Sequence, residues 1–206
     1  MLSEVDVKLH TFSSPTFASV VAEAIRFFKN TPVHSLPPVS SFEGAGVYAL
    51  YYIGAFDLYE RLAKMNEKEY VLPIYVGKAV PEGWRTARTS ASPGEHVLHS
   101  RLRQHARNIR QTKNLNVADF YTRFMVLKDV EIDLVVPVEA ELIRHYVPVW
   151  NNLVDGFGNH DPGAGRYNQA KSEWDVLHPG RTWAERLTGN PPDLGRITAK
   201  LKRWRR

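Results

Sequence analysis

The run GVYALYYIG, residues 46–54, constrains the fold more than any other part of the chain. Its side chains form two alternating sets, namely Val47, Ala49, Tyr51 and Ile53 against Tyr48, Leu50 and Tyr52. Alternation of this length predicts a β-strand. The run opens with Gly-x-Tyr and closes with Tyr-Ile-Gly, which raises the question of whether both ends serve one site.

Apolar periodicity predicts further helices and strands along the chain. Helices are expected from Ser14-Pro15 to Phe28 and over residues 57–68, 99–113 and 138–146, and strands over 72–76 and 120–127. The stretch TPVHSLPP, residues 31–38, is expected to be a proline-rich link without regular structure, and residues 81–93 a polar loop. Residues 174–187 are expected to be partly helical, and residues 200–206 a basic tail.

Composition narrows the class of function. The 206 residues include no cysteine, which excludes a disulfide framework and a thiolate metal site and fits a reducing compartment. No apolar stretch approaches the ~20 residues of a membrane span, so we expect no membrane partner. The net charge of +5 leaves a polyanionic partner open.

The helix expected over residues 99–113 has an unusual charge pattern, because it contains no aspartate or glutamate. Its apolar seam consists of Leu98, Leu102, Ala106 and Ile109. Arg101 and His105, four residues apart, lie along one edge of this seam. The other edge carries Arg103, Arg107 and Arg110. The pattern fits a surface that faces phosphates, and it fits equally an ordinary solvated basic face.

Glu139 and Asn151 are two further candidates near the last of these helices. Glu139 follows Pro137 and is expected in the first turn, where the helix dipole favours a carboxylate. It is therefore either a functional acid or only a residue that starts the helix. Asn151 follows Pro148 and is either functional or only a turn residue.

Taken together, these pieces resemble the GIY-YIG nuclease superfamily. The first half-motif is Gly46-Val47-Tyr48, and the second is Tyr75-Val76-Gly77 within IYVGKA, where Lys78 also fits. Tyr52-Ile53-Gly54 is rejected as the second half, because it lies on the same strand as the first. The two tyrosines are farther apart than is usual in the family, and the helix over residues 57–68 is interpreted as an insertion.

The remaining family positions carry over one at a time. The segment RLRQH supplies Arg101 and His105, EAELI supplies Glu139 rather than Glu141, and PVWN supplies Asn151. Both half-motifs have valine where the family has isoleucine, a mild change on a buried face. Flanking segments such as TPVHSLPP, DGFGNHDPGAGR and AKSEWDVLHPGR are similar to the type II restriction endonuclease branch, so the resemblance extends from about Phe27 to Trp183.

The resemblance implies an α+β fold, with a small three-stranded GIY-YIG sheet flanked by helices. It implies one endonuclease domain over residues 1–206. Within this domain we expect a catalytic core over about 44–153, an N-terminal helical extension over 1–43, and a C-terminal extension over 154–206 for recognition and dimer contacts. The implied activity is metal-dependent hydrolysis of double-stranded DNA at a short GC-rich palindrome such as CCGCGG.

The same resemblance assigns roles within the site. As the one matched acid, Glu139 is expected to bind one divalent ion, most plausibly Mg²⁺, and Arg101 to form a forked contact with the scissile phosphate. Either Tyr75 or Tyr48 would orient or deprotonate the water, with a slight preference for Tyr75. Lys78 and Arg101 would lower the tyrosine pKa. His105 would contact Tyr48 or a phosphate, and Asn151 would position the site.

DNA recognition is expected to come from basic and amide side chains outside this set. The candidates are Arg85, Arg88, Arg103, Arg107, Arg110, Asn159, His160 and Arg166. Cutting a palindrome implies a homodimer, and a restriction enzyme implies a cognate DNA methyltransferase in the same system and a location in the prokaryotic cytoplasm. The alternatives are a repair-type or homing-type GIY-YIG nuclease, or a DNA-binding module without catalysis.

Overall fold

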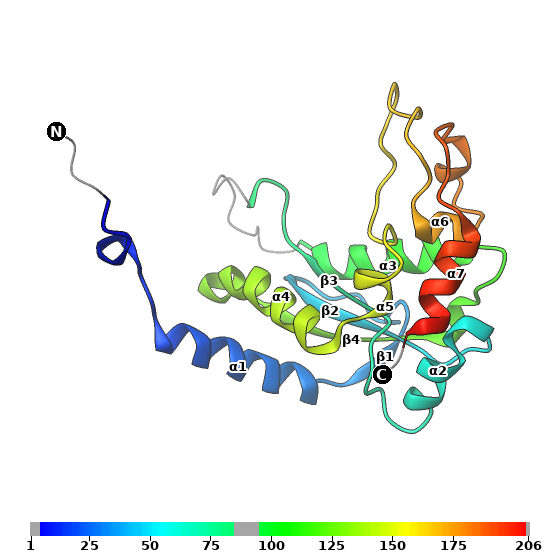
Figure 1. Cartoon of the computed structure of the whole chain (residues 1–206). Coiled ribbons are helices and arrows are strands. Elements are labelled where there is room, and N and C mark those ends of the chain that lie inside the picture. The colour runs from blue at the N-terminus through cyan, green and yellow to red at the C-terminus, as the bar shows by residue number, and fades with distance from the viewer. Residues whose placement is uncertain (1–4, 85–94, 205–206) are drawn as a thin grey trace.

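The fold is built on a four-stranded antiparallel sheet with helices on both faces (Figure 1). A computed structural model of the chain describes residues 5–84 and 95–204. The strand order is β1-β4-β2-β3, with β1 at Val33–Ser35, β2 at Ala45–Tyr52, β3 at Tyr75–Ala79 and β4 at Phe120–Leu127. Strand β2 is therefore internal, while β3 forms one edge of the sheet.

All eight residues of β2 are buried, because each face of the sheet has its own core. Tyr48, Leu50 and Tyr52 belong to one apolar cluster, and Val47, Ala49 and Tyr51 to the other. A side chain added at Gly46 would place its Cβ 2.0 Å from the Met125 carbonyl oxygen, so β4 passes too closely for any other residue there. The tyrosine-rich run thus supplies both cores at once.

Helices α1 (Pro15–Asn30) and α4 (Val135–Tyr146) cover one face of the sheet. The opposite face carries α3 (Val97–Gln111) and α5 (Val149–Asn152), together with the C-terminal part of the chain. The other helices are α2 (Glu60–Asn66), α6 (Glu173–Leu177) and α7 (Leu194–Arg203). Short 3₁₀ turns occupy Val7–His10, Asp57–Tyr59, Val117–Asp119, Asp129–Leu134 and Ala184–Arg186.

The expected α+β class is confirmed, but the sheet has four strands instead of three. The additional strand is β1, inside the stretch that was expected to be an irregular link. Its residues Val33, His34 and Ser35 pair with β4. Three residues are too short to show an alternating pattern, and their strand character comes from the neighbouring backbone of β4.

Two element boundaries were also predicted wrongly. The second strand begins at Tyr75 instead of Leu72, because the side chain of Asn66 bonds both backbone groups of Leu72. Helix α4 begins at Val135, and Pro137 is its third residue. Proline is tolerated in a first turn, whose N–H groups have no partner within the helix. Glu139 consequently lies in the second turn and not in the first.

The expected basic tail is helical in part, since residues 200–203 complete helix α7, while residues 205–206 lie outside the described residues. Lys200 forms an ion pair of 2.5 Å with Glu173, so α7 is attached to α6. The helices in the described ranges 5–84 and 95–204 are all too short or too polar to cross a lipid bilayer.

Candidate active site

The two motif tyrosines lie on one face of the antiparallel pair formed by β2 and β3. In the register of this pair, Tyr48 stands opposite Gly77 and Tyr75 stands opposite Leu50. The two phenol rings are 6.2 Å apart between centroids. A Cβ at position 77 would come within 2.5 Å of the Tyr48 hydroxyl, so the glycine of the second half-motif makes room for the tyrosine of the first.

His105 projects from α3 onto these tyrosines. Its Nε2 lies 2.5 Å from the Tyr48 hydroxyl, and its ring stacks on Phe157 at 4.4 Å. The side chain is fully buried, and burial together with the nearby Arg101 charge holds the pKa of His105 well below its usual value. The imidazole is therefore neutral at physiological pH.

Arg101 lies one turn before His105 and is held entirely by uncharged groups. One terminal nitrogen donates to the Gly158 carbonyl at 2.9 Å. The other donates to Gln104 Oε1 at 2.7 Å and lies 2.8 Å from His160 Nε2. Because none of these partners is a carboxylate, the positive charge of Arg101 is oriented without being neutralised.

Lys78 and Glu139 form an ion pair across the edge of the sheet. Lys78 is on β3, and Glu139 reaches it from α4 on the face opposite the tyrosines. Both side chains are partly buried. In residues 5–84 and 95–204 no three histidine, aspartate or glutamate side chains converge as a metal cluster. The Glu139 carboxylate alone suits an ion such as Mg²⁺ only where substrate and water oxygens complete the coordination.

Asn151 fixes the edge strand that carries Tyr75 and Lys78. Its Oδ1 accepts from the Val76 N–H at 2.8 Å, and its Nδ2 donates to the Val76 carbonyl at 2.9 Å. The amide thus takes the place that a further strand would occupy beside β3. Asn151 does not line the cleft described next.

One cleft of about 590 Å³ joins the two sides of this site. Its lining includes the side chains predicted for chemistry at Tyr75, Lys78, Arg101 and Glu139. The phenol of Tyr75 and the carboxylate of Glu139 thus face the same space, although they approach it from opposite faces of the sheet. Tyr48 and His105 are fully buried behind Tyr75. The geometry therefore distinguishes a tyrosine at the cleft from a tyrosine behind it.

The two phenols also differ in their electrostatic surroundings. Burial raises the pKa of Tyr48 well above its usual value, and the proximity of Tyr75 raises it further. Burial also raises the pKa of Tyr75, while the Arg101 charge and a hydrogen bond from Tyr48 act in the opposite direction. The Arg101 charge lowers and the Glu139 charge raises the pKa of both phenols, so the difference between them is the hydrogen bond that Tyr75 receives from Tyr48.

The predicted DNA-binding side chains fall into three groups. Arg107 and His160 line the cleft itself, and His160 also bonds Gln104 through Nδ1 at 3.0 Å. Arg103, Arg110, Asn159 and Arg166 are exposed outside the cleft. Arg85 and Arg88 lie outside the described residues.

Sequence reasoning missed the residues that cover this site. Phe157 packs on His105 and, edge to face, on Tyr75, while Gln104 links Arg101 to His160. The spacing of three between Arg101 and Gln104 was a usable signal on a helix. For Phe157, the only signal in the sequence was its position in a glycine-rich segment. Buried Arg181 was covered only by the resemblance of the segment AKSEWDVLHPGR, and nothing in the local pattern indicated its burial, because arginine is rarely buried.

Comparison with known proteins assigns the chain to a family. The comparison with curated proteins gave no match. A family model described as the Eco29kI GIY-YIG domain matches residues 40–204, which is most of the chain and includes every residue of the cleft. The chain therefore belongs to the Eco29kI family of GIY-YIG restriction endonucleases.

Proposed function

We propose that this chain is a type II restriction endonuclease that hydrolyses phosphodiester bonds of double-stranded DNA at a short GC-rich palindrome such as CCGCGG. The observation that carries the proposal is the single cleft lined by Tyr75, Arg101, Lys78 and Glu139. Phosphodiester hydrolysis requires an activated water and stabilised charge on the phosphoryl oxygens. This cleft brings together a phenol for the first requirement and cations for the second.

Arg101 is the group that would bind the scissile phosphate. Its present partners are a carbonyl, an amide and an imidazole, all uncharged at neutral pH. An anionic phosphate oxygen is a stronger acceptor than any of them. Arg107, six residues further along α3, adds a second positive charge to the cleft. DNA would thus enter a site whose charge is already complementary.

Tyr75 would accept the proton of the attacking water, assisted by the groups behind it. Because His105 is neutral, we infer that its Nε2–H donates to the Tyr48 oxygen, which leaves the Tyr48 hydroxyl free to donate to Tyr75. This order would leave buried Nδ1 as an unpaired acceptor and not as an unpaired N–H. Two donors in series then stabilise negative charge on Tyr75.

Glu139 would hold one Mg²⁺, which would supply positive charge near the phosphoryl oxygens when bound. Lys78 balances the Glu139 carboxylate in the structure and lies in the same cleft as Tyr75. Its positive charge would offset the Glu139 carboxylate, which raises the pKa of Tyr75.

A palindromic target favours a homodimer with one site for each strand. Exposed apolar side chains along residues 5–12 support this part of the proposal, because each of Val5, Val7, Leu9 and Phe12 is at least 69% exposed. A restriction enzyme would also require a cognate methyltransferase in the same cell, and would act on DNA in the cytoplasm.

The function is tested by incubating the purified chain with mixed plasmid DNA and Mg²⁺ and sequencing the fragment ends. We expect discrete ends at one palindromic sequence. Random nicks would instead indicate a repair-type nuclease, ends at one long asymmetric sequence a homing-type nuclease, and intact DNA a binding module.

Glu139→Gln should abolish this cutting because it removes the only carboxylate that lines the cleft within the described residues. Glu141→Gln is the matched control. Glu141 lies on the same helix, forms an exposed ion pair with Arg144 and does not line the cleft. This control should cut at the wild-type rate, and equal activity of the two variants would remove Glu139 from the site.

A further inference from the structure

Arg181 and Asp175 form a buried ion pair behind the active site. Arg181 has no exposed surface and Asp175 is 2% exposed. The pair is bidentate, with Nε donating to Oδ1 at 2.8 Å and a terminal nitrogen donating to Oδ2 at 2.7 Å. A buried ion pair often contributes little net stability, since desolvation offsets the attraction between the charges. Its presence here therefore calls for a further role.

The other N–H groups of Arg181 indicate what that role is, because they donate to three backbone carbonyls of the short loop 156–159. One terminal nitrogen donates to Gly156 at 3.0 Å. The other donates to Phe157 at 3.1 Å and to Asn159 at 3.3 Å. Trp174 and Trp183 pack against the guanidinium at 4.9 and 4.4 Å, which restricts its motion. One side chain thus fixes three of the four carbonyls between residues 156 and 159.

This loop touches the reacting groups directly. The Phe157 ring stacks on His105 at an interplanar angle of 18° and contacts Tyr75 with a centroid distance of 4.9 Å. The Gly158 carbonyl accepts from Arg101. A Cβ at Gly158 would lie 2.8 Å from the Tyr75 hydroxyl, so the backbone itself is in contact with that phenol. A shift of the loop would therefore move Tyr75, Arg101 and His105 together.

We propose that Arg181 is a positioning residue for catalysis, holding residues 156–159 so that Phe157 and Gly158 fix His105, Tyr75 and Arg101. The catalytic role of those three side chains rests on the proposed function. Arg181 itself lies outside the cleft and has no access to DNA. Its effect would reach the reaction through the loop that it holds, and its positive charge also contributes to the lowered pKa of His105.

The test separates positioning from stability with three variants. Arg181→Met removes the donors but leaves the Asp175 carboxylate buried and unpaired, so it should also lower the melting temperature. The double variant Asp175→Asn/Arg181→Met removes that charge and should recover much of the lost stability, while the loop carbonyls stay unbound. Arg186→Met is the matched control, because Arg186 lies in the same segment and pairs with Asp161 at the surface.

Three measurements are made on each variant. In single-turnover cleavage with Mg²⁺, both Arg181 variants should be slower by about 10- to 100-fold, the size expected from a small misplacement of catalytic groups. Binding of a duplex without Mg²⁺ should weaken by a smaller factor than cleavage slows, because the exposed Arg103 and Arg110 on α3 stay in place. Hydrogen exchange should become faster at residues 156–160 and stay as in the wild type at β2 and β3. Arg186→Met should match the wild type in all three.

The outcomes distinguish this inference from the proposed function. Wild-type cleavage rates in the stabilised double variant, or unaltered exchange at residues 156–160, would overturn the role of Arg181. A wild-type chain that cuts no DNA would overturn the proposed function. In that case exchange at the loop still decides whether Arg181 holds it.

Discussion

Tyr75 must lose its phenolic proton before it can act as the base that the proposed reaction requires. An unperturbed phenol has a pKa of about 10, and burial raises the pKa of Tyr75 above that value. Arg101 and the hydrogen bond from Tyr48 oppose the rise without cancelling it. Only a small fraction of Tyr75 is therefore a phenolate near neutral pH, and this fraction limits a reaction in which Tyr75 is the base.

This limit predicts the pH dependence of cleavage. The reactive form is the deprotonated one and its pKa is raised, so the single-turnover rate should rise with pH by about tenfold per unit through the neutral and mildly alkaline range. Tyr75→Phe should lose most of the activity and the slope, while Tyr70→Phe, on the other core, should retain both. A flat profile in the wild type would contradict Tyr75 as the base.

At the scale of single residues, the sequence predicted the motif positions but not their depth. The order of the motif identified both Tyr48 and Tyr75, yet only the strand register and the packing of α3 place Tyr75 at the cleft and Tyr48 behind it. Two of the three groups that hold Arg101, the Gly158 carbonyl and His160, lie more than fifty positions away. Contacts of that kind have no local pattern from which they could be predicted.

At the scale of elements, β3 is an edge strand, so its outer backbone groups need hydrogen-bond partners and the strand must be held in place. An edge strand has unpaired N–H and C=O groups on its outer side. Here the side-chain amide of Asn151, from α5, binds both outer groups of Val76. Since Val76 lies between Tyr75 and Gly77, this contact fixes the strand at the second half-motif.

Asn151→Ala should therefore weaken both stability and cleavage. Two partly buried backbone groups would lose their partner, at a cost of about 1–3 kcal/mol each in free energy of unfolding where water cannot replace it. Asn152→Ala is the matched control, since Asn152 is the next residue of α5 and is exposed. Urea unfolding and single-turnover cleavage check this. Equal stability of the two variants would show that β3 is held by other contacts.

Elements with a strong local pattern were predictable, whereas those made by tertiary contacts were not. Strand β4 has the predicted limits Phe120–Leu127, and α3 begins and ends two residues before its expected range. The three residues of β1 form a strand only because β4 lies beside them. The apparent helix over residues 57–68 is a 3₁₀ turn followed by α2.

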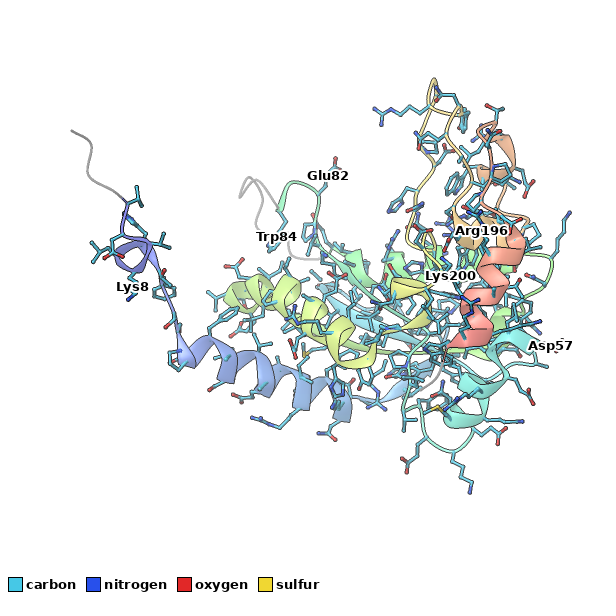
Figure 2. The ribbon with its side chains drawn as sticks, viewed as in Figure 1. Lys8, Asp57, Glu82, Trp84, Arg196 and Lys200 are labelled. Carbon is cyan, nitrogen blue, oxygen red and sulfur yellow. The ribbon has the colours of Figure 1, made fainter. Side chains whose placement is uncertain are left out.

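At the scale of the whole molecule, the sheet and its covering helices are well packed, whereas residues 5–12 are exposed. Residues 5–12 project from the body beyond α1, and Lys8 marks this segment (Figures 1 and 2). Leu9 is 82% exposed and Phe12 is 89% exposed. Large apolar side chains contribute about 1.5–3 kcal/mol each when they become buried. A second copy of the chain on a palindromic duplex would give this segment a surface to cover.

Sedimentation with a short duplex that carries the target should therefore find two chains per duplex. In a separate cleavage assay, the wild-type enzyme should convert supercoiled plasmid directly to linear DNA. Leu9→Ser/Phe12→Ser should weaken the dimer, so that nicked circles accumulate before linear DNA forms. Val39→Ser/Val130→Ser is the control, because these exposed valines lie elsewhere on the surface. One chain per duplex, with both strands cut in succession, would refute the dimer because a single site would then serve both strands.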